Sequence, residues 1–173
     1  MNKFLDEGNL QFDFSAFQSV KRFDDNKINA YGMKAVDFIA EDNDYLYFIE
    51  TKDFQHPKAT PERRNEDYEI LNEAVKNKKS VFTIEMGVKI KDSLLRRYSE
   101  GEVFTKKVIY LLVINHDKLG EFERGLLMTK VNNHIPKGLN DNRFPAFTSI
   151  EFDLVNIEQL KNYKIFCTTK SGG

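Results

Sequence analysis

Residues 35–53 read AVDFIAEDNDYLYFIETKD, and this stretch decides which fold we expect. Ala35–Ala40 and Tyr45–Lys52 are rich in β-branched and aromatic residues, which is typical of β-strands. The segment between them, Glu41–Asp44, contains Asp and Asn residues that bond to the nearby backbone in tight turns. The stretch therefore predicts an antiparallel β-hairpin.

Three charged residues, Asp37, Glu50 and Lys52, lie inside these two apolar runs. Taking a charge out of water is costly unless the charge is paired or bound to something. Both faces of the hairpin are largely apolar, as in a strand that is covered on both sides. Charges in such positions point to a functional site.

The register of the hairpin decides whether these side chains meet. With a two-residue loop at positions 43 and 44, Asp37 pairs directly with Glu50; with the loop one position earlier, it pairs with Phe48. Because side chains alternate along a strand, either loop puts Asp37 on the face that carries Glu50 and Lys52. The Cβ atoms of the two acidic residues would then be about 5 Å apart, or roughly 7 Å on the diagonal. Either distance allows two carboxylates to share one cation, whereas an odd loop or a bulge would separate them.

Two carboxylates and a lysine suit metal-assisted chemistry on a phosphate. Mg²⁺ prefers oxygen ligands and is usually held by one or two carboxylates together with water and substrate phosphate. Asp37 and Glu50 fit that role, and the backbone carbonyl of Thr51 is a further candidate ligand. Lys52 is placed to stabilise negative charge on the phosphate or to orient the attacking water. We expect burial to lower the pKa of Lys52, which would suit proton transfer.

These residues resemble the PD-(D/E)xK nuclease superfamily, which has the restriction-endonuclease-like fold. The motif stands here as Val36-Asp37-Phe38, followed by Ile49-Glu50-Thr51-Lys52. The resemblance implies an α/β fold with a mixed central β-sheet flanked by helices. It also implies Mg²⁺, with Mn²⁺ as an alternative, and hydrolysis of nucleic-acid phosphodiester bonds, with DNA favoured over RNA by family frequency. In that pattern Asp37, Glu50 and the Thr51 carbonyl hold the metal, and Asp37, Glu50 and Lys52 are the catalytic residues.

The chain departs from the family pattern in two places. The proline before the first acidic residue is replaced by Val36. Many members carry another acidic residue on an early helix, for which Glu7 and Asp13 are candidates here. Members of the superfamily also lose activity while they keep the fold. The alternative reading is therefore a catalytically inactive nucleic-acid or protein binding module, and a third is a structural domain in which Glu50 and Lys52 form a simple ion pair.

The composition agrees with one small domain over residues 1–173, which is long enough to bury a core. Apolar residues make up 40% and charged residues 31% of the chain, which excludes a disordered protein and a membrane protein. We see no signal peptide, and the longest apolar run, Val108–Ile114, is too short to span a bilayer. The single cysteine, Cys167, excludes an intramolecular disulfide. We expect a cytoplasmic protein that binds nucleic acid and no membrane, with a homodimer as an alternative to a monomer.

A net charge of −1 means that tight binding to DNA would need a local basic patch. Residues 55–64 contain two prolines and read as an exposed loop just beyond Lys52. Its basic side chains Lys58, Arg63 and Arg64 are our candidates for substrate binding. Four other basic clusters are candidates for such a patch if they surround the site, although each is more typical of a solvated face. These are Lys76–Lys79, Lys89–Lys91, Arg96-Arg97 and Lys106-Lys107.

The rest of the chain mixes helices and strands, as an α/β fold requires. Periodicity predicts helices over 65–79, over the second half of 80–98 and over 118–131. We expect strands at 106–115, 148–155 and 164–169, a helical turn at 157–161, and loops at 23–26 and 132–143. Residues 9–23 fit either a helix or a strand.

Overall fold

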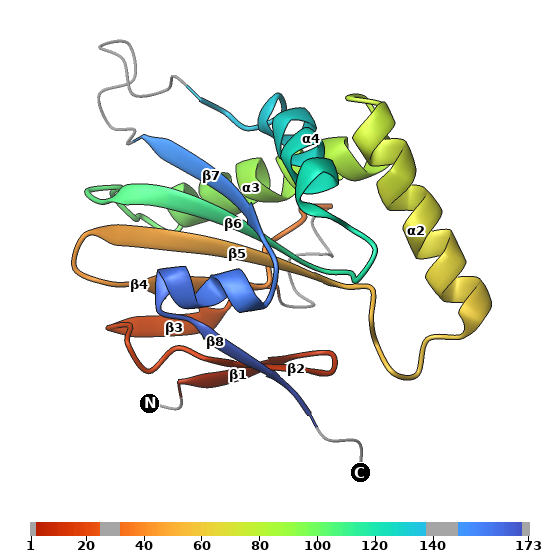
Figure 1. The fold of residues 1–173 in the computed structure, drawn as a ribbon. Helices are drawn as coiled ribbons and strands as arrows, with labels where there is room; N and C mark the ends of the chain where they lie inside the picture. The colour runs from red at the N-terminus through yellow and green to blue at the C-terminus, as the bar shows by residue number, and fades with distance from the viewer. Residues whose placement is uncertain (1–2, 25–31, 138–148, 171–173) are drawn as a thin grey trace.

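The protein, as a computed structural model, is described here for residues 3–24, 32–137 and 149–170. Five strands form a central mixed sheet in the order β3-β4-β5-β6-β7, and three strands form a small antiparallel sheet in the order β1-β2-β8 (Figure 1). The elements are β1 (Phe4–Glu7), β2 (Leu10–Asp13), β3 (Ser19–Arg22), β4 (Phe38–Glu41), β5 (Tyr45–Asp53), α2 (Pro61–Lys76), α3 (Val81–Ser99), β6 (Lys107–Asn115), α4 (Glu121–Asn132), β7 (Ile150–Val155), the 3₁₀ helix η1 (Glu158–Tyr163) and β8 (Phe166–Thr169). The predicted α/β class with a mixed central sheet is confirmed.

Strand β5 lies in the middle of the central sheet. It is antiparallel to β4 and parallel to β6, so the crossover between β5 and β6 carries helices α2 and α3. In the β4–β5 hairpin Phe38 is opposite Ile49 and Glu41 is opposite Leu46. Asp42 shapes the turn, because its Oδ1 accepts hydrogen bonds from the backbone N–H groups of Asp44, at 2.9 Å, and Tyr45, at 2.8 Å. The loop residues are therefore those at 43 and 44, which is the first of the two predicted registers.

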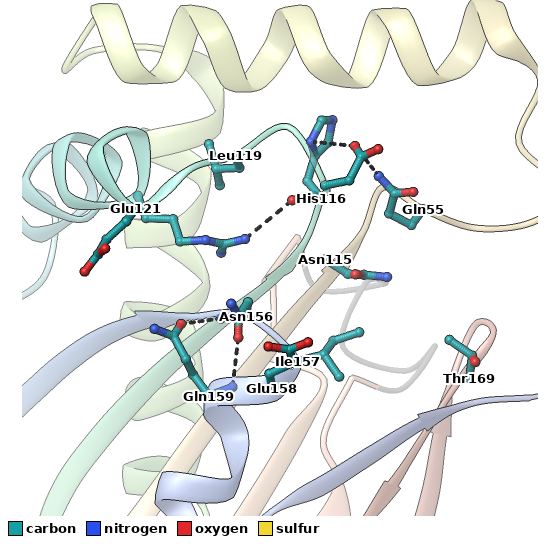
Figure 2. Close-up of a pocket in the computed structure, with 12 residues that line it drawn as sticks. Gln55, Asn115, His116, Leu119, Glu121, Asn156, Ile157, Glu158, Gln159 and Thr169 are labelled. Carbon is teal, nitrogen blue, oxygen red and sulfur yellow. Dashed lines mark hydrogen bonds and ion pairs between the residues drawn. The ribbon is translucent and has the colours of Figure 1, made fainter.

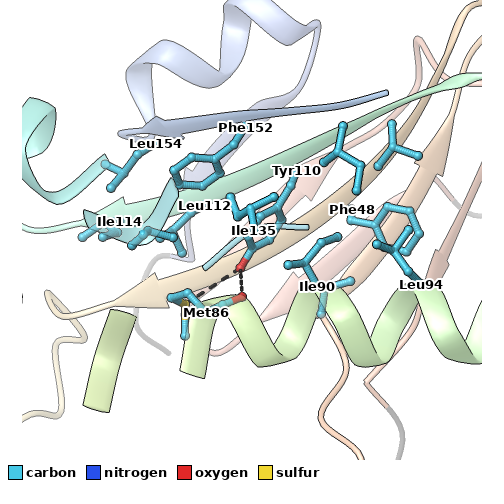
Figure 3. Close-up of a cluster of buried hydrophobic side chains, with 14 of the residues drawn as sticks. Phe48, Met86, Ile90, Leu94, Tyr110, Leu112, Ile114, Ile135, Phe152 and Leu154 are labelled. Carbon is cyan, nitrogen blue, oxygen red and sulfur yellow. Dashed lines mark hydrogen bonds between the residues drawn. The ribbon is translucent and has the colours of Figure 1, made fainter. Parts of the chain in front are cut away.

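Helices α2, α3 and α4 cover one face of the central sheet (Figure 1). The even-numbered residues of β5 point toward them, and Phe48 packs with Ile90 and Leu94 of α3 (Figure 3). The fully buried Tyr110 of β6 reaches into the same cluster and donates a hydrogen bond from its hydroxyl to the carbonyl of Met86, at 3.2 Å. This bond satisfies the polar end of a side chain whose ring is otherwise in an apolar core.

The small sheet and η1 cover the opposite face of the central sheet (Figure 1). Their core is aromatic: the Phe38 ring lies 5.4 Å from that of Phe12 and 5.7 Å from that of Phe14, and the Phe17 ring lies 5.1 Å from that of Tyr47. Because both faces are covered, β5 and β6 are apolar on both sides, as expected for parallel strands inside a layered fold.

The helices begin and end differently from their predicted positions. Helix α2 starts at Pro61, inside the expected loop 55–64, because Thr60 caps it and proline suits its first turn. Helix α3 covers the whole of 81–99, where we expected helix only in the second half, and Gly101 follows it with φ of 84°. None of the helices in the described segments is long and apolar enough to cross a membrane.

The region that we left open, residues 9–23, forms β2 and β3, and β1 precedes it without having been predicted. The other predicted strands and the helical turn at 157–161 agree with β6, β7, β8 and η1 to within a few residues. The predicted loops at 23–26 and 132–143 extend into residues outside the described segments.

Gly87 marks a close approach between α3 and the turn that follows α4. A Cβ atom at Gly87 would lie 2.4 Å from the Cβ of His134 and 2.8 Å from its carbonyl oxygen. Replacing Gly87 by alanine should therefore destabilise the protein by about 1–3 kcal/mol, although alanine is the better helix former. The matched control is Gly125→Ala in α4, where nothing lies within 4 Å, and this change should stabilise by roughly 0.5–1 kcal/mol. Urea unfolding of the two variants measures both effects, and a stabilised Gly87→Ala protein would contradict the close packing.

Candidate active site

Two carboxylates face each other across the β4–β5 hairpin. Continuing the register by one residue beyond Phe38 and Ile49 sets Asp37 opposite Glu50. Both are buried, with 5% and 0% of their surface exposed. The backbone N–H of Thr51 donates to Oδ2 of Asp37 at 2.6 Å, which fixes this carboxylate against β5. The expected approach of the two acidic residues is thus present in the fold.

Two lysines neutralise this carboxylate pair. The Nζ of Lys52 lies 2.8 Å from Oε1 of Glu50. The Nζ of Lys89, from helix α3, lies 2.7 Å and 2.9 Å from the two carboxylate oxygens of Glu50 and 4.0 Å from Oδ1 of Asp37. The acidic pair therefore has two cationic partners, one from its own strand and one from the helical layer.

The prediction that Lys89 belongs to a solvated face is wrong. Only 9% of its surface is exposed, because it lies on the side of α3 that packs against the sheet. It follows the buried Phe82 by seven residues and the buried Met86 by three, which is the spacing of one helix face. This periodicity was the signal in the sequence that could have identified it. One turn further on, the Oγ of Ser93 accepts a hydrogen bond from the N–H of Val36 at 3.0 Å, so the same face of α3 also positions the residue before Asp37.

The environment of Asp37 favours its neutral form. Burial is the largest cause, followed by the negative charge of Glu50, and together they raise the pKa of Asp37 to about 8. Lys89 and the hydrogen bond from Thr51 act in the opposite direction without cancelling this effect. The two carboxylates are thus close enough to repel each other, which is the condition under which a cation between them is strongly held.

Lys52 behaves differently from the expectation. Burial does act to lower the pKa of Lys52, but the Glu50 carboxylate at 2.8 Å outweighs it, so the pKa is raised above its ordinary value of 10.5. Lys52 therefore carries a positive charge at neutral pH, and the predicted lowering of its pKa is wrong. A permanently charged ammonium suits stabilisation of negative charge and does not suit removal of a proton from water.

Of the two candidates for an additional acidic residue, Glu7 lies closer to the site. Its charge contributes to the raised pKa of Asp37, and its carboxylate also pairs with Arg22 at 2.7 Å. Asp13 lies at the other end of the β1–β2 hairpin, opposite Phe4, and accepts a hydrogen bond from the N–H of Ser15. Both residues are on strands or strand ends, whereas the family pattern has this residue on a helix.

A cavity of about 400 Å³ opens at the end of β5, beside this cluster. Its lining includes Lys52, Lys58 and Arg63, so the structure brings two of the three predicted substrate-binding residues next to Lys52. Arg63 is also paired with the buried carboxylate of Asp67, at 3.2 Å. Arg64 points elsewhere and lines a separate cavity of about 240 Å³.

The other basic clusters do not extend this positive surface. Arg97 is buried and pairs with Glu102 at 2.7 Å, and Lys106 pairs with Glu41 at 2.7 Å. These two were expected to be solvated, and that expectation is wrong for Arg97. Residues 76–79 are exposed, as predicted.

A larger cavity, of about 760 Å³, lies at the carboxyl ends of β6 and β7 (Figure 2). Its polar groups are largely engaged with one another: Asn156 and Gln159 exchange two hydrogen bonds, and Gln55 donates to Asp117 at 2.6 Å. Asp37 and Glu50 line neither this cavity nor the smaller one, whereas Thr51 and Lys52 line the smaller one. The candidate site therefore rests on the charge cluster and the smaller cavity.

The donor atoms at the carboxylate pair fit a divalent cation. Asp37, Glu50 and the Thr51 carbonyl offer the oxygen ligands that Mg²⁺ prefers. The repulsion that raises the pKa of Asp37 is relieved by a positive charge, and in this structure Lys89 supplies that charge. Among the residues that the structure describes, no group of three or more Asp, Glu, His or Cys side chains forms a metal centre.

No protein-family model matches the chain, and no curated protein or solved structure matches it either.

Proposed function

We propose that this protein is a metal-dependent nuclease that hydrolyses phosphodiester bonds, with DNA as the favoured substrate over RNA. The observation that carries the proposal is the buried pair of Asp37, directly before β4, and Glu50 on the neighbouring antiparallel strand β5, with the Lys52 ammonium 2.8 Å from Glu50. The motif's resemblance to PD-(D/E)xK nucleases and the mixed central sheet support the same reading.

Asp37, Glu50 and the Thr51 carbonyl would hold Mg²⁺ or Mn²⁺. When bound, the metal would polarise the scissile phosphate and lower the pKa of a water molecule. Lys52 remains protonated and can stabilise the negative charge that develops on the phosphate oxygens. Lys58 and Arg63, on the wall of the adjoining cavity, can contact neighbouring phosphates of the strand.

The test is cleavage of end-labelled single- and double-stranded DNA and RNA in Mg²⁺ or Mn²⁺, with EDTA as the blank. We expect Lys52→Ala to lower the rate of cleavage by about 10²–10³-fold, because one charge-stabilising group is lost from the transition state. The control is Lys79→Ala, which changes an exposed lysine on the loop between α2 and α3 and should leave the rate unchanged. Equal rates for wild type and Lys52→Ala would contradict the role of Lys52, and no cleavage of any substrate by wild type would contradict the nuclease.

A second candidate function is a non-catalytic nucleic-acid or protein binding module. It is favoured by one observation: Lys89 already compensates the charge of Glu50 through both carboxylate oxygens. In this reading the cluster is a structural ion network, and Lys58 and Arg63 serve only to bind. Retention of nucleic acid by wild type in a filter-binding assay, without cleavage in either metal, would favour it over the nuclease.

A further inference from the structure

Lys89 occupies the position in which a cation best serves the two carboxylates. Its ammonium bridges both oxygens of Glu50 and lies 4.0 Å from Oδ1 of Asp37. It reaches this position from α3, a different layer of the fold from the strands that carry the carboxylates. The ammonium is thus a tethered counter-ion, held in place by the packing of its helix.

This ammonium and a divalent metal compete for the oxygens of Glu50. Mg²⁺ binds oxygen at about 2.0–2.1 Å, and the same oxygens are already in contact with the Nζ of Lys89. Glu50 already pairs with Lys52, and a divalent cation on the same buried carboxylate would repel the Lys89 ammonium at short range. A divalent cation on Glu50 therefore weakens the binding of Lys89 to this carboxylate.

The helix offers a place to which Lys89 can move. Glu85 lies four residues before Lys89 on α3, one turn away on the same side of the helix. Its side chain is 32% exposed and pairs with Lys34 at 3.0 Å. Burial opposes ionisation of Glu85, but Lys34, Lys52 and Lys89 outweigh it and lower the pKa of this carboxyl. Glu85 is therefore an ionised partner within reach of the flexible Lys89 side chain.

We propose that Lys89 competes with the metal for the carboxylate pair. Its ammonium binds the pair until a divalent cation displaces it toward Glu85. This proposal rests on the proposed function, because it concerns the same carboxylates. It adds a residue that sets the metal affinity of the site without contacting the substrate. Lys89 is thus a positioning residue, and its effect is measurable without catalysis.

The test is calcium binding at fixed pH by isothermal titration calorimetry and by thermal melting, because calcium can occupy the site without turnover. We expect Lys89→Met to bind calcium about ten-fold or more tightly than wild type, since the competing charge is gone. Glu85→Gln, which removes the place to which Lys89 moves, should bind calcium more weakly than wild type. The control is Lys91→Met, an exposed lysine two residues along the same helix, whose calcium affinity should equal that of wild type.

The outcomes separate the two proposals. If Lys89→Met and wild type bind calcium equally, the competition is contradicted while the nuclease proposal stands. If Lys89→Met binds calcium more tightly but no variant cleaves nucleic acid, Lys89 is the competitor and the nuclease proposal fails. If neither protein binds calcium, both are overturned. Should Lys89→Met fail to fold without metal, the Glu85→Gln titration decides, and an unchanged affinity there counts against the proposal.

Discussion

Replacing Glu50 by glutamine is expected to lower the free energy of unfolding by about 3–5 kcal/mol, because it leaves a buried lysine without its carboxylate. Glu50 is fully buried and is the partner of both Lys52 and Lys89. Glutamine keeps the shape and the hydrogen-bonding oxygen but cannot compensate two positive charges. Chemical denaturation of the metal-free protein measures the loss.

Two further variants test whether the loss comes from the unpaired charge. Glu50→Gln combined with Lys89→Met should recover about 1–3 kcal/mol relative to the sum of the single changes. Glu85→Gln is the comparison, because Glu85 lies on α3 with Lys89 but is partly exposed and paired with Lys34. We therefore expect it to lower the free energy of unfolding by less than about 1 kcal/mol. A Glu50→Gln protein as stable as wild type would mean that the ion network contributes little to the fold.

Asp37→Asn is expected to stabilise the protein at alkaline pH and, under the proposed function, to abolish cleavage. The folded protein raises the pKa of this carboxyl from 3.8 to about 8, mainly through burial and then through the charge of Glu50. The folded state therefore binds a proton more tightly than the unfolded chain, so the stability due to neutral Asp37 is complete below about pH 4 and is lost as the pH rises through about 8. Asparagine stays neutral throughout, and its amide oxygen can still accept the hydrogen bond from Thr51.

The measurement is the stability of Asp37→Asn minus that of wild type, in EDTA, from about pH 4 to pH 9. The difference should grow with pH and reach roughly 2–5 kcal/mol in favour of the variant. Glu69→Gln, at an exposed position on α2, serves as the control and should show no growing difference. Under the proposed function, Asp37→Asn should lose at least about 10³-fold in rate in the nuclease assay, since a proposed metal ligand is gone. A stability difference that does not change with pH would contradict the raised pKa of Asp37.

The hairpin and its carboxylates could be predicted from the sequence because the information is local. The alternation of side chains and the turn chemistry of Asp42 together set the register that brings Asp37 opposite Glu50. The raised pKa of Lys52 could not be predicted, since it depends on how closely Glu50 approaches in the fold. Burial alone predicts a lowered pKa for Lys52, whereas the pKa is raised.

Lys89 and the N-terminal strands were missed for different reasons. Lys89 stands in a Lys-Ile-Lys sequence that looks like an exposed charge run, and only its spacing from Phe82 and Met86 indicates the buried face. The residues of β2 fit a helix or a strand locally, and the partner that decides between them, β8, lies near the other end of the described chain. Tertiary pairing of this kind overrides local propensity.

The pairing of β2 with β8 also has a consequence for the order in which the protein folds. The core under the helices joins residues between Phe23 and Leu154, whereas the aromatic side needs Leu10–Asp13 and Phe166–Thr169, which lie nearer the two ends of the described chain, to meet. Closing so long a loop is entropically costly and is slow compared with forming local contacts. We therefore expect the aromatic cluster that contains Phe12, Phe14 and Phe38 to stay incompletely covered during synthesis until β8 has emerged. This period of exposure is when the nascent chain is most open to aggregation and to capture by chaperones.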